Sequence, residues 1–348
     1  MKFPVLFLGM LAMACFGAGC LGSSTPTAPD GGVFRTSNVG ADWAQPSVLN
    51  QGAKIGSIAN VSTVAAAFDP QDPLAMYVGT TQNGLLVTLD GGESWQQARG
   101  ITTGQITAVA VDPKSTCTVF AARANQILKT ETCGRDWKQA YYDPRAAQVY
   151  TSLAIDWANP RTVYAGNVDG DILRSDDGGA SWRVLQRAEA RINALTLDPR
   201  DSRVLYAATN GAGLLKTTDG GATWVAIRDV LENYDGSRRP LFVAIDPANS
   251  AIIYHVSRNG ILRSEDAGTS WRALALPTPP SATNIRAFAV HPKSPNVLVY
   301  STDTSVVFSA DTGTTWSPKK LPTTRSSSFL VFDGSAQNAL YLGTIVRQ

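Results

Sequence analysis

Carboxylate side chains offer the first chemistry that this chain could perform, because two of them on opposite sides of a sugar can hydrolyse a glycosidic bond. Such a pair lies about 5–9.5 Å apart and keeps one carboxyl group protonated. Eight carboxylates fall in loops that could share one surface. They are Asp143, Asp169, Asp171, Glu189, Asp229, Glu232, Asp235 and Asp303. Because they are scattered along the chain, we assign no catalytic residue and keep a glycoside hydrolase as an alternative.

Arginine and tyrosine side chains in the same loops offer a second chemistry, the binding of anions. A guanidinium group makes paired hydrogen bonds to a carboxylate or phosphate, and Arg and Tyr are enriched where proteins bind proteins. The candidate binding residues are Tyr142, Arg145, Arg187, Arg191, Tyr234, Arg258, Arg286 and Arg325. The alternative interpretation is a solvated rim of charges that keeps the protein soluble.

The sequence has few residues that could support nucleophilic catalysis, metal binding or nucleic-acid binding. The chain has 348 residues, two His and four Cys, and His255 and His291 belong to no Ser-His-Asp arrangement. The segment Asp169-Gly170-Asp171 resembles a fragment of a calcium loop, but without the full spacing it is interpreted as a turn. A net charge of +2 gives no bulk attraction to nucleic acid. We therefore predict no metal, no cofactor and no nucleic-acid partner.

A short pattern occurs seven times and organises these loops: Ser/Thr, any, Asp, any, Gly, any, any, Trp. The copies, called boxes below, are Thr36–Trp43, Thr88–Trp95, Thr130–Trp137, Ser175–Trp182, Thr217–Trp224, Ser264–Trp271 and Ser309–Trp316. Asn38 and Thr132 replace Asp in two of them. Asp can accept hydrogen bonds from its own turn, Gly permits positive φ, and Trp buries a large surface. The predicted structural residues are Asp90, Trp95, Asp177, Trp182, Asp219, Trp224, Asp266, Trp271, Asp311 and Trp316.

The segments around each box predict four short antiparallel strands per repeat. An apolar run ends in Asp-Pro or a variant, as at Asp112-Pro113, and a β-branched and aromatic run follows. Units of this length indicate an all-β fold, a seven-bladed β-propeller of four-stranded antiparallel blades. The first box has no strand pair before it, and the last strand pair, at 329–344, has no box after it. We therefore expect the N- and C-terminal segments to close the last blade together.

The repeat resembles the Asp-box, or bacterial-neuraminidase repeat, over essentially all of residues 33–348. Proteins with this repeat include sialidases, xyloglucanase-type glycosidases, sortilin-type receptors and the photosystem II assembly-factor type, which this chain resembles in size. The resemblance implies a propeller whose boxes lie away from the functional site. Xyloglucanase-type enzymes use two such propellers, whereas this chain has one. The Arg-Ile-Pro segment of sialidases has only an echo at Arg239-Pro240.

The two sides of such a ring differ in charge. The boxes and the Asp-Pro turns share one side, which we call the bottom face. The connections between blades, and the loop between the second and third strands of each blade, share the other side, the top face. These loops carry an excess of about eight positive charges, against +2 for the whole chain, so we expect the top face to attract anions.

The cysteines and the N-terminus indicate an exported protein. Residues 1–19 have the features of a signal peptide, and Gly17-Ala18-Gly19-Cys20 resembles the lipobox of bacterial lipoproteins, which implies lipidation of Cys20. Residues 20–32 would then be the lipidated Cys and a flexible tether, followed by one propeller domain over 33–348. Leu21 resembles the choice that sorts lipoproteins to the outer membrane. Cys117 and Cys133 lie at the same end of a predicted hairpin, so we expect a disulfide, two buried thiols being the alternative.

These observations together predict a non-catalytic, extracytoplasmic binding or scaffold propeller. It would be monomeric and lipid-anchored in a bacterial envelope, or secreted if Cys20 is not acylated. Its partner would be a protein, bound through the Arg- and Tyr-rich top face, and resemblance to assembly factors implies a role in assembling an envelope complex. The alternative is a glycoside hydrolase or a lectin-like propeller that binds an anionic glycan on the same face.

Overall fold

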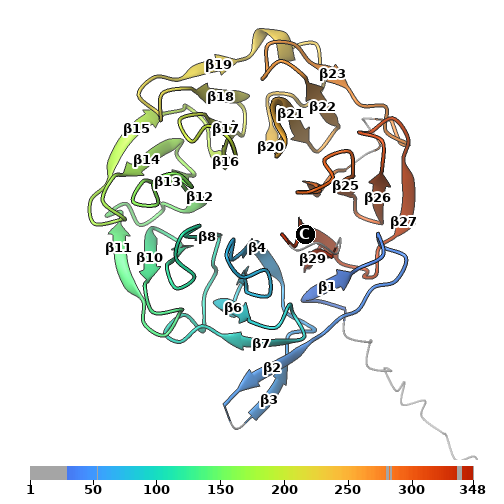
Figure 1. Ribbon diagram of the computed structural model, residues 1–348. Coiled ribbons are helices and arrows are strands. Elements are labelled where there is room, and N and C mark those ends of the chain that lie inside the picture. Colours follow the sequence, from blue (N-terminus) through green and yellow to red (C-terminus); the bar gives the residue numbers. More distant parts are fainter. Residues whose placement is uncertain (1–29, 53, 280–281, 283, 335–338, 348) are drawn as a thin grey trace, which may run out of the picture.

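Seven sheets surround a central axis as the blades of a closed ring (Figure 1). The structure is a computed structural model, which describes residues 30–348 except 53, 280–281, 283, 335–338 and 348. The seven-bladed, all-β fold expected from the repeats is confirmed. The predicted signal peptide, Cys20 and most of the tether lie outside the described residues. Within the described part, no helix has both the length and the apolar character needed to cross a bilayer.

Five blades have four antiparallel strands each, numbered from the axis outward. Blade 2 is β8 (Ala108–Val111), β9 (Val119–Arg123), β10 (Gln126–Thr130) and β11 (Lys138–Tyr142), and blade 3 is β12 (Tyr150–Ile155), β13 (Val163–Asn167), β14 (Asp171–Ser175) and β15 (Arg183–Arg187). Blade 4 is β16 (Ile192–Leu197), β17 (Leu205–Thr209), β18 (Leu214–Thr217) and β19 (Val225–Ile227). Blade 5 is β20 (Pro240–Asp246), β21 (Asn249–Ser257), β22 (Ile261–Ser264) and β23 (Arg272–Ala273), and blade 6 is β24 (Ala287–Val290), β25 (Leu298–Ser301), β26 (Ser305–Ser309) and β27 (Ser317–Lys320).

Blade 7 closes the ring from both ends of the chain, as predicted. It consists of β28 (Ser326–Phe332), β29 (Leu340–Ile345) and β1 (Val33–Thr36), with β1 antiparallel to β29. The expectation of four strands is wrong for this blade, because only an isolated bridge, Arg35 to Ala44, stands where the fourth strand would run. Pro46, two residues after Ala44, has no N–H to continue the ladder.

Blade 1 is larger than predicted. Its four strands are β4 (Thr63–Phe68), β5 (Met76–Thr80), β6 (Leu85–Thr88) and β7 (Ser94–Gln97). The hairpin of β2 (Val48–Gln51) and β3 (Lys54–Ser57) extends this sheet to six strands, with β2 parallel to β7. The hairpin projects outward from the ring in Figure 1. Its inner side covers Trp95, whose indole N–H donates to the carbonyl of Pro46 (3.2 Å) and which is fully buried.

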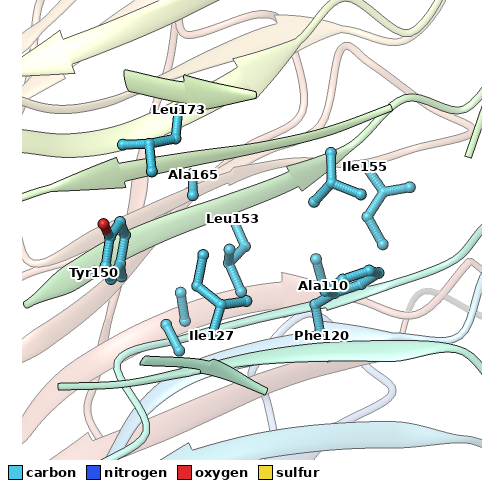
Figure 2. Packing of buried hydrophobic residues seen from close by; sticks show 11 residues of the cluster. Ala110, Phe120, Ile127, Tyr150, Leu153, Ile155, Ala165 and Leu173 are labelled. Carbon is cyan, nitrogen blue, oxygen red and sulfur yellow. The ribbon is translucent and has the colours of Figure 1, made fainter. Parts of the chain in front are cut away.

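The hydrophobic core lies between neighbouring blades rather than inside any one of them. Figure 2 shows one such cluster, in which Phe120 and Ile127 of blade 2 pack against Tyr150, Leu153 and Leu173 of blade 3. The indole of Trp182 packs against the same cluster. A blade therefore hides its apolar face only when its neighbour is present, which is why the repeats must form a ring.

The second strand of each blade carries a buried aromatic residue, and in blades 2, 3, 4 and 7 this residue contacts the box of the next blade. These residues are Tyr77, Phe120, Tyr164, Tyr206, Tyr254, Tyr300 and Tyr341, all buried. The Tyr341 hydroxyl donates to the carbonyl of Gly91 (2.7 Å), and Tyr164 donates in the same way to Gly220 (3.1 Å). At Gly179, where φ is +92°, a Cβ would come within 2.8 Å of the Phe120 ring. Gly179 is thus favoured both by its left-handed backbone and by the close approach of the neighbouring blade.

The box carboxylates act within their own turns. Asp90 accepts hydrogen bonds from the Thr88 hydroxyl (2.7 Å) and from the N–H and hydroxyl of Ser94 (2.9 and 2.6 Å). The same contacts recur at Asp177, Asp219, Asp266 and Asp311. In the fifth of these boxes, the bond from the Thr315 hydroxyl contributes most to holding the pKa of Asp311 at about 2, against an ordinary 3.8.

The predicted disulfide is present and links Cys117 to Cys133, 16 residues apart. Cys133 occupies the fourth position of the box in which Thr132 replaces Asp, and its φ is +54°. The Cys133 N–H also donates to the Cys117 carbonyl (3.2 Å). The disulfide therefore joins the two ends of the β9–β10 hairpin. It lies in the box in which Thr132 stands at the Asp position and Cys133 has a positive φ.

Candidate functional site

The predicted binding residues gather on the top face. Arg191, Arg286 and Arg325 directly precede the inner strands β16, β24 and β28, so all three lie at the same end of the ring. Arg187 ends β15 at that end, and Arg258 follows β21 there. The connections between blades position these side chains, while the boxes occupy the opposite face. The structure brings five of the eight candidates together in two separate groups and leaves the other three apart.

The first group is an ion-pair network between blades 2 and 3. Arg145 Nη2 lies 2.7 Å from Asp143 Oδ2 and 2.8 Å from Asp171 Oδ2. Arg145 Nη1 lies 3.4 Å from Asp169 Oδ2, and Arg187 Nε lies 3.3 Å from Asp171 Oδ1. We call Asp143, Arg145, Asp169, Asp171 and Arg187 the Arg145 network. Its two arginines face three carboxylates, so it presents no excess of positive charge.

The network brings two carboxylates together, but in a setting unlike that of a glycosidase pair. Asp143 and Asp171 are both buried and both contact the same guanidinium nitrogen. The hydrogen bond from Arg145 is the main cause that lowers the pKa of Asp143 below 3.8, with a further bond from the Tyr150 hydroxyl. A general acid in glycoside hydrolysis needs the opposite shift. The arrangement therefore holds an ionised carboxylate in place rather than a transferable proton.

The second group surrounds a cavity of about 970 Å³ between blades 4 and 5, which we call the arginine pocket. Its polar lining comes from the start of blade 4, from the 228–239 connection and from the loops after β17 and β21. The lining side chains that can make ionic or polar contacts are Arg191, Asn193, Asn210, Glu232, Tyr234, Asp235, Ser237, Arg238, Arg239, Arg258 and Asn259. Four arginines thus meet two carboxylates around one hollow. Three predicted residues, Arg191, Tyr234 and Arg258, belong to it.

Most of the positive charge in the arginine pocket is unused. Arg238 Nη2 pairs with Glu232 Oε1 at 2.9 Å. Among the residues that the structure describes, the guanidinium groups of Arg191, Arg239 and Arg258 make no ion pair and no hydrogen bond, and all three side chains are exposed. Free guanidinium groups that converge on one cavity offer paired donors to a carboxylate or phosphate.

The 228–239 connection, which begins with η1 (Asp229–Leu231), forms a fixed wall of this pocket. The Tyr234 hydroxyl donates to the Trp271 carbonyl (2.6 Å), and His255 Nε2 contacts the Ser237 carbonyl (2.8 Å). The Arg238 carbonyl accepts from the N–H groups of Gly211 and Gly213 (2.8 and 3.1 Å). Leu231 is buried in the core below. With these bonds, the wall needs little reordering when a ligand binds.

The remaining candidates lie outside both groups. Tyr142 is half exposed at the end of β11. Arg286 Nε pairs with Asp303 Oδ1 (2.7 Å), and Arg325 Nη1 donates to the Asn60 carbonyl (3.1 Å). Conversely, the sequence reasoning did not single out Arg238 and Arg239 as site residues. Two adjacent arginines could have indicated this site. The net charge of their connection is zero, however, because its carboxylates equal its arginines in number, so a count of charge by loop did not identify them.

Comparisons with known proteins support the fold. No protein-family model matches the chain, and no curated protein matches it. Among solved structures, it is similar to the GH74 xyloglucanase from Xanthomonas campestris (19% identity, TM-score 0.66, covering 82% of this chain and 51% of the enzyme). It is also similar to YCF48 bound to D1 peptide (17%, 0.62, 83% and 94%) and to YCF48 from Cyanidioschyzon merolae (16%, 0.61, 82% and 95%). The chain thus spans about half of the xyloglucanase and nearly all of either YCF48 chain.

Proposed function

We propose that this protein is a non-catalytic binding propeller whose arginine pocket holds an acidic segment of a partner protein. The observation that supports this most directly is the convergence of Arg191, Arg239 and Arg258, none of them paired, on one cavity with a fixed wall. A carboxylate-bearing segment is the ligand whose charge and hydrogen-bonding geometry complement these groups. The alternative hypothesis, that the arginines form a solvated rim that only keeps the protein soluble, does not require them to converge on a cavity.

The similar structures favour a protein ligand over a polysaccharide substrate. YCF48, a propeller of nearly the same length, has a solved structure bound to D1 peptide. The xyloglucanase that shares the fold is about twice as long as the part that this chain matches. Together with the lowered pKa of Asp143, which opposes a role as general acid, this supports binding rather than hydrolysis. A role in assembling an envelope complex is the context we propose for such binding.

The test uses a fluorescein-labelled hexaglutamate peptide and the purified protein at low salt. We expect the Arg191→Glu/Arg258→Glu double variant to bind the peptide at least tenfold more weakly than the natural chain, because two attractive charges become repulsive. Arg200→Glu/Arg203→Glu is the control with the same change in net charge: both arginines are exposed on the bottom face, where Arg203 pairs with Asp201, so binding should be unchanged. Added salt should weaken binding to the natural chain, because the pocket is solvent-accessible.

Three results would overturn the proposal. Peptide binding that is equal in the double variant and the natural chain would exclude the arginine pocket as the binding surface. No measurable binding of the acidic peptide, with binding of an oligogalacturonate in its place, would assign the pocket to an anionic glycan. Equal weakening by Arg200→Glu/Arg203→Glu, which changes the net charge by the same amount, would show that net charge, rather than the pocket, governs binding.

We also propose that the protein is exported and held at the bacterial envelope by a lipid on Cys20. The support is the sequence of residues 1–21, and several acyl chains on one Cys give firm membrane attachment. Expression in a bacterial host with an alkyne analogue of palmitate should label the natural chain and Cys15→Ser, but not Cys20→Ser. Label retained by Cys20→Ser would refute lipidation at that residue.

A further inference from the structure

A second cavity adjoins the arginine pocket and differs from it in chemistry. It has a volume of about 440 Å³ and lies between the 228–239 connection and the outer strands of blade 5. Tyr234, Asp235, Ser237 and Asn259 line both cavities, so the two share a wall. The remaining lining contains a group of aliphatic side chains. They are Ile261, Leu262, Ala273, Leu274, Ala275 and Leu276.

Polar groups at the base of this second cavity are already engaged. The Ser257 hydroxyl donates to the Gly260 carbonyl (3.2 Å), and the Tyr234 hydroxyl donates to the Trp271 carbonyl (2.6 Å). His255 is fully buried, with Nε2 bonded to Ser237, so its unpaired Nδ1 is covered by protein atoms. An occupant therefore meets aliphatic surface on the side of β22 and β23, while the polar side chains of Asn233, Asp235 and Asn259 line the cavity from the 228–239 connection and the loop after β21. Such a cavity, within the ~300–1,000 Å³ typical of ligand sites, suits an apolar group.

We infer that the apolar cavity takes a large aliphatic or aromatic side chain of the same segment whose carboxylate occupies the arginine pocket. This inference rests on the proposed function and makes it more specific: the partner segment carries an acidic residue and an apolar residue close together. The shared wall of Tyr234 and Asn259 is the reason, because one short segment that crosses it meets both cavities. The arginines then supply attraction and the apolar cavity supplies selectivity.

The experiment uses two sets of fluorescein-labelled peptides that differ at one position. Each peptide is a hexaglutamate in which a single Phe or a single Ala replaces Glu, with the replacement moved through all six positions. Burial of a Phe side chain is expected to make the best Phe peptide bind about tenfold or more tightly than its Ala counterpart. Ala275→Trp should remove this advantage, because the exposed Ala275 lines the cavity and a Trp there fills it.

Further variants separate the role of the apolar cavity from that of the arginine pocket. Ala222→Trp places the same side chain at an exposed bottom-face alanine and should leave the Phe advantage intact. Arg258→Glu should weaken both members of each pair. If the Ala peptides bind and depend on Arg258, but Phe gives no advantage at any position, the apolar cavity is overturned and the proposed function stands. If neither set binds, the proposed function fails and the inference with it. A Phe advantage that survives Ala275→Trp would also contradict the inference.

Discussion

The two arginine-rich regions of the top face differ in what their arginines contact. In the Arg145 network, two arginines face three carboxylates and their charge is consumed within the protein. In the arginine pocket, four arginines face two carboxylates and one ion pair forms. Residue type is the same in both regions, so abundance of arginine does not identify a binding site. What identifies it is arginine that the fold leaves without a partner.

Part of the difference arises in one equivalent loop. In blade 3, the loop between the second and third strands contains Asp169 and leads into Asp171, and both contact Arg145. In blades 4 and 5, the equivalent loops bring Asn210 and Asn259 to the cavity. An amide can accept a hydrogen bond but neutralises no charge. The carboxylates of the blade 3 loop, together with Asp143 from the connection between blades 2 and 3, therefore neutralise Arg145, and the equivalent loops of blades 4 and 5 offer amides in their place.

The largest expected effect comes from removing the central arginine of the network. Arg145→Ala leaves Asp143 and Asp171 buried without their main partner, and we expect it to lower the free energy of unfolding by about 2–3 kcal/mol. This is less than for a fully buried pair, because Arg145 is half exposed. Arg191→Ala should change stability by less than about 0.5 kcal/mol. Urea unfolding measures both, and equal losses in the two variants would erase the contrast between the regions.

As the pH falls, the contribution of His255, beside the pocket, to the free energy of unfolding should be lost before that of Asp143 in the Arg145 network. Burial lowers the pKa of His255 below 6.5, so the unfolded chain takes up a proton there first, and the free energy of unfolding falls as pH drops below about 6.5. One group contributes at most about 1.4 kcal/mol per pH unit. Asp143, with a pKa lowered from 3.8, stabilises above that pH and loses its contribution only in stronger acid.

Urea unfolding at pH 7.5 and 5.5 tests this assignment. His255→Gln can still donate to the Ser237 carbonyl but does not titrate, so its loss of stability over this range should be smaller than that of the natural chain. Arg145→Ala should keep the full loss. An unchanged pH dependence in His255→Gln would place the acid-sensitive group elsewhere.

A smaller effect is expected from the hydroxyl that fixes the wall of the arginine pocket. Tyr234→Phe removes the bond to the Trp271 carbonyl and should cost about 1 kcal/mol, with faster amide hydrogen exchange confined to residues 228–239. Tyr142→Phe, at a half-exposed tyrosine, should change neither quantity. Exchange that rises equally across blades 2 and 3 would show that the wall is not a local unit.

The smallest expected effect comes from removing the one ion pair described in the arginine pocket, which leaves its arginines even less neutralised than those of the Arg145 network. Glu232→Gln frees Arg238 from its ion pair and should strengthen hexaglutamate binding by up to about fivefold, the range of an exposed ion pair. Asp169→Asn in the network should leave peptide affinity unchanged. Weaker binding by Glu232→Gln would mean that the Glu232 carboxylate orients Arg238 for the ligand.

The repeats made most of the fold predictable, because each box marks the same turn in a blade and the pairing of the two terminal segments follows from counting strands. The β2–β3 hairpin escaped prediction because residues 44–57 have no copy in another repeat, so nothing in the sequence indicated that β2 pairs in parallel with β7. The side of the ring on which the candidate arginines lie was predictable, because they stand in the connections between blades. Which arginines are paired and which are free was not predictable. Arg145 pairs with carboxylates 24 and 26 residues away, and only the folded ring shows which charges meet.

The junction of the two chain ends in blade 7 sets an order of events for biogenesis. Thr344 Oγ1 donates to the carbonyl of Gly32, 312 residues earlier, and among the described strands β1 pairs with β29 alone. During synthesis, β1 is therefore made before β29, and its edge stays unpaired until the final hairpin has been made. Because an unpaired strand edge can pair with other chains, the interval before β29 is made is the stage at which this protein is most exposed to misassembly.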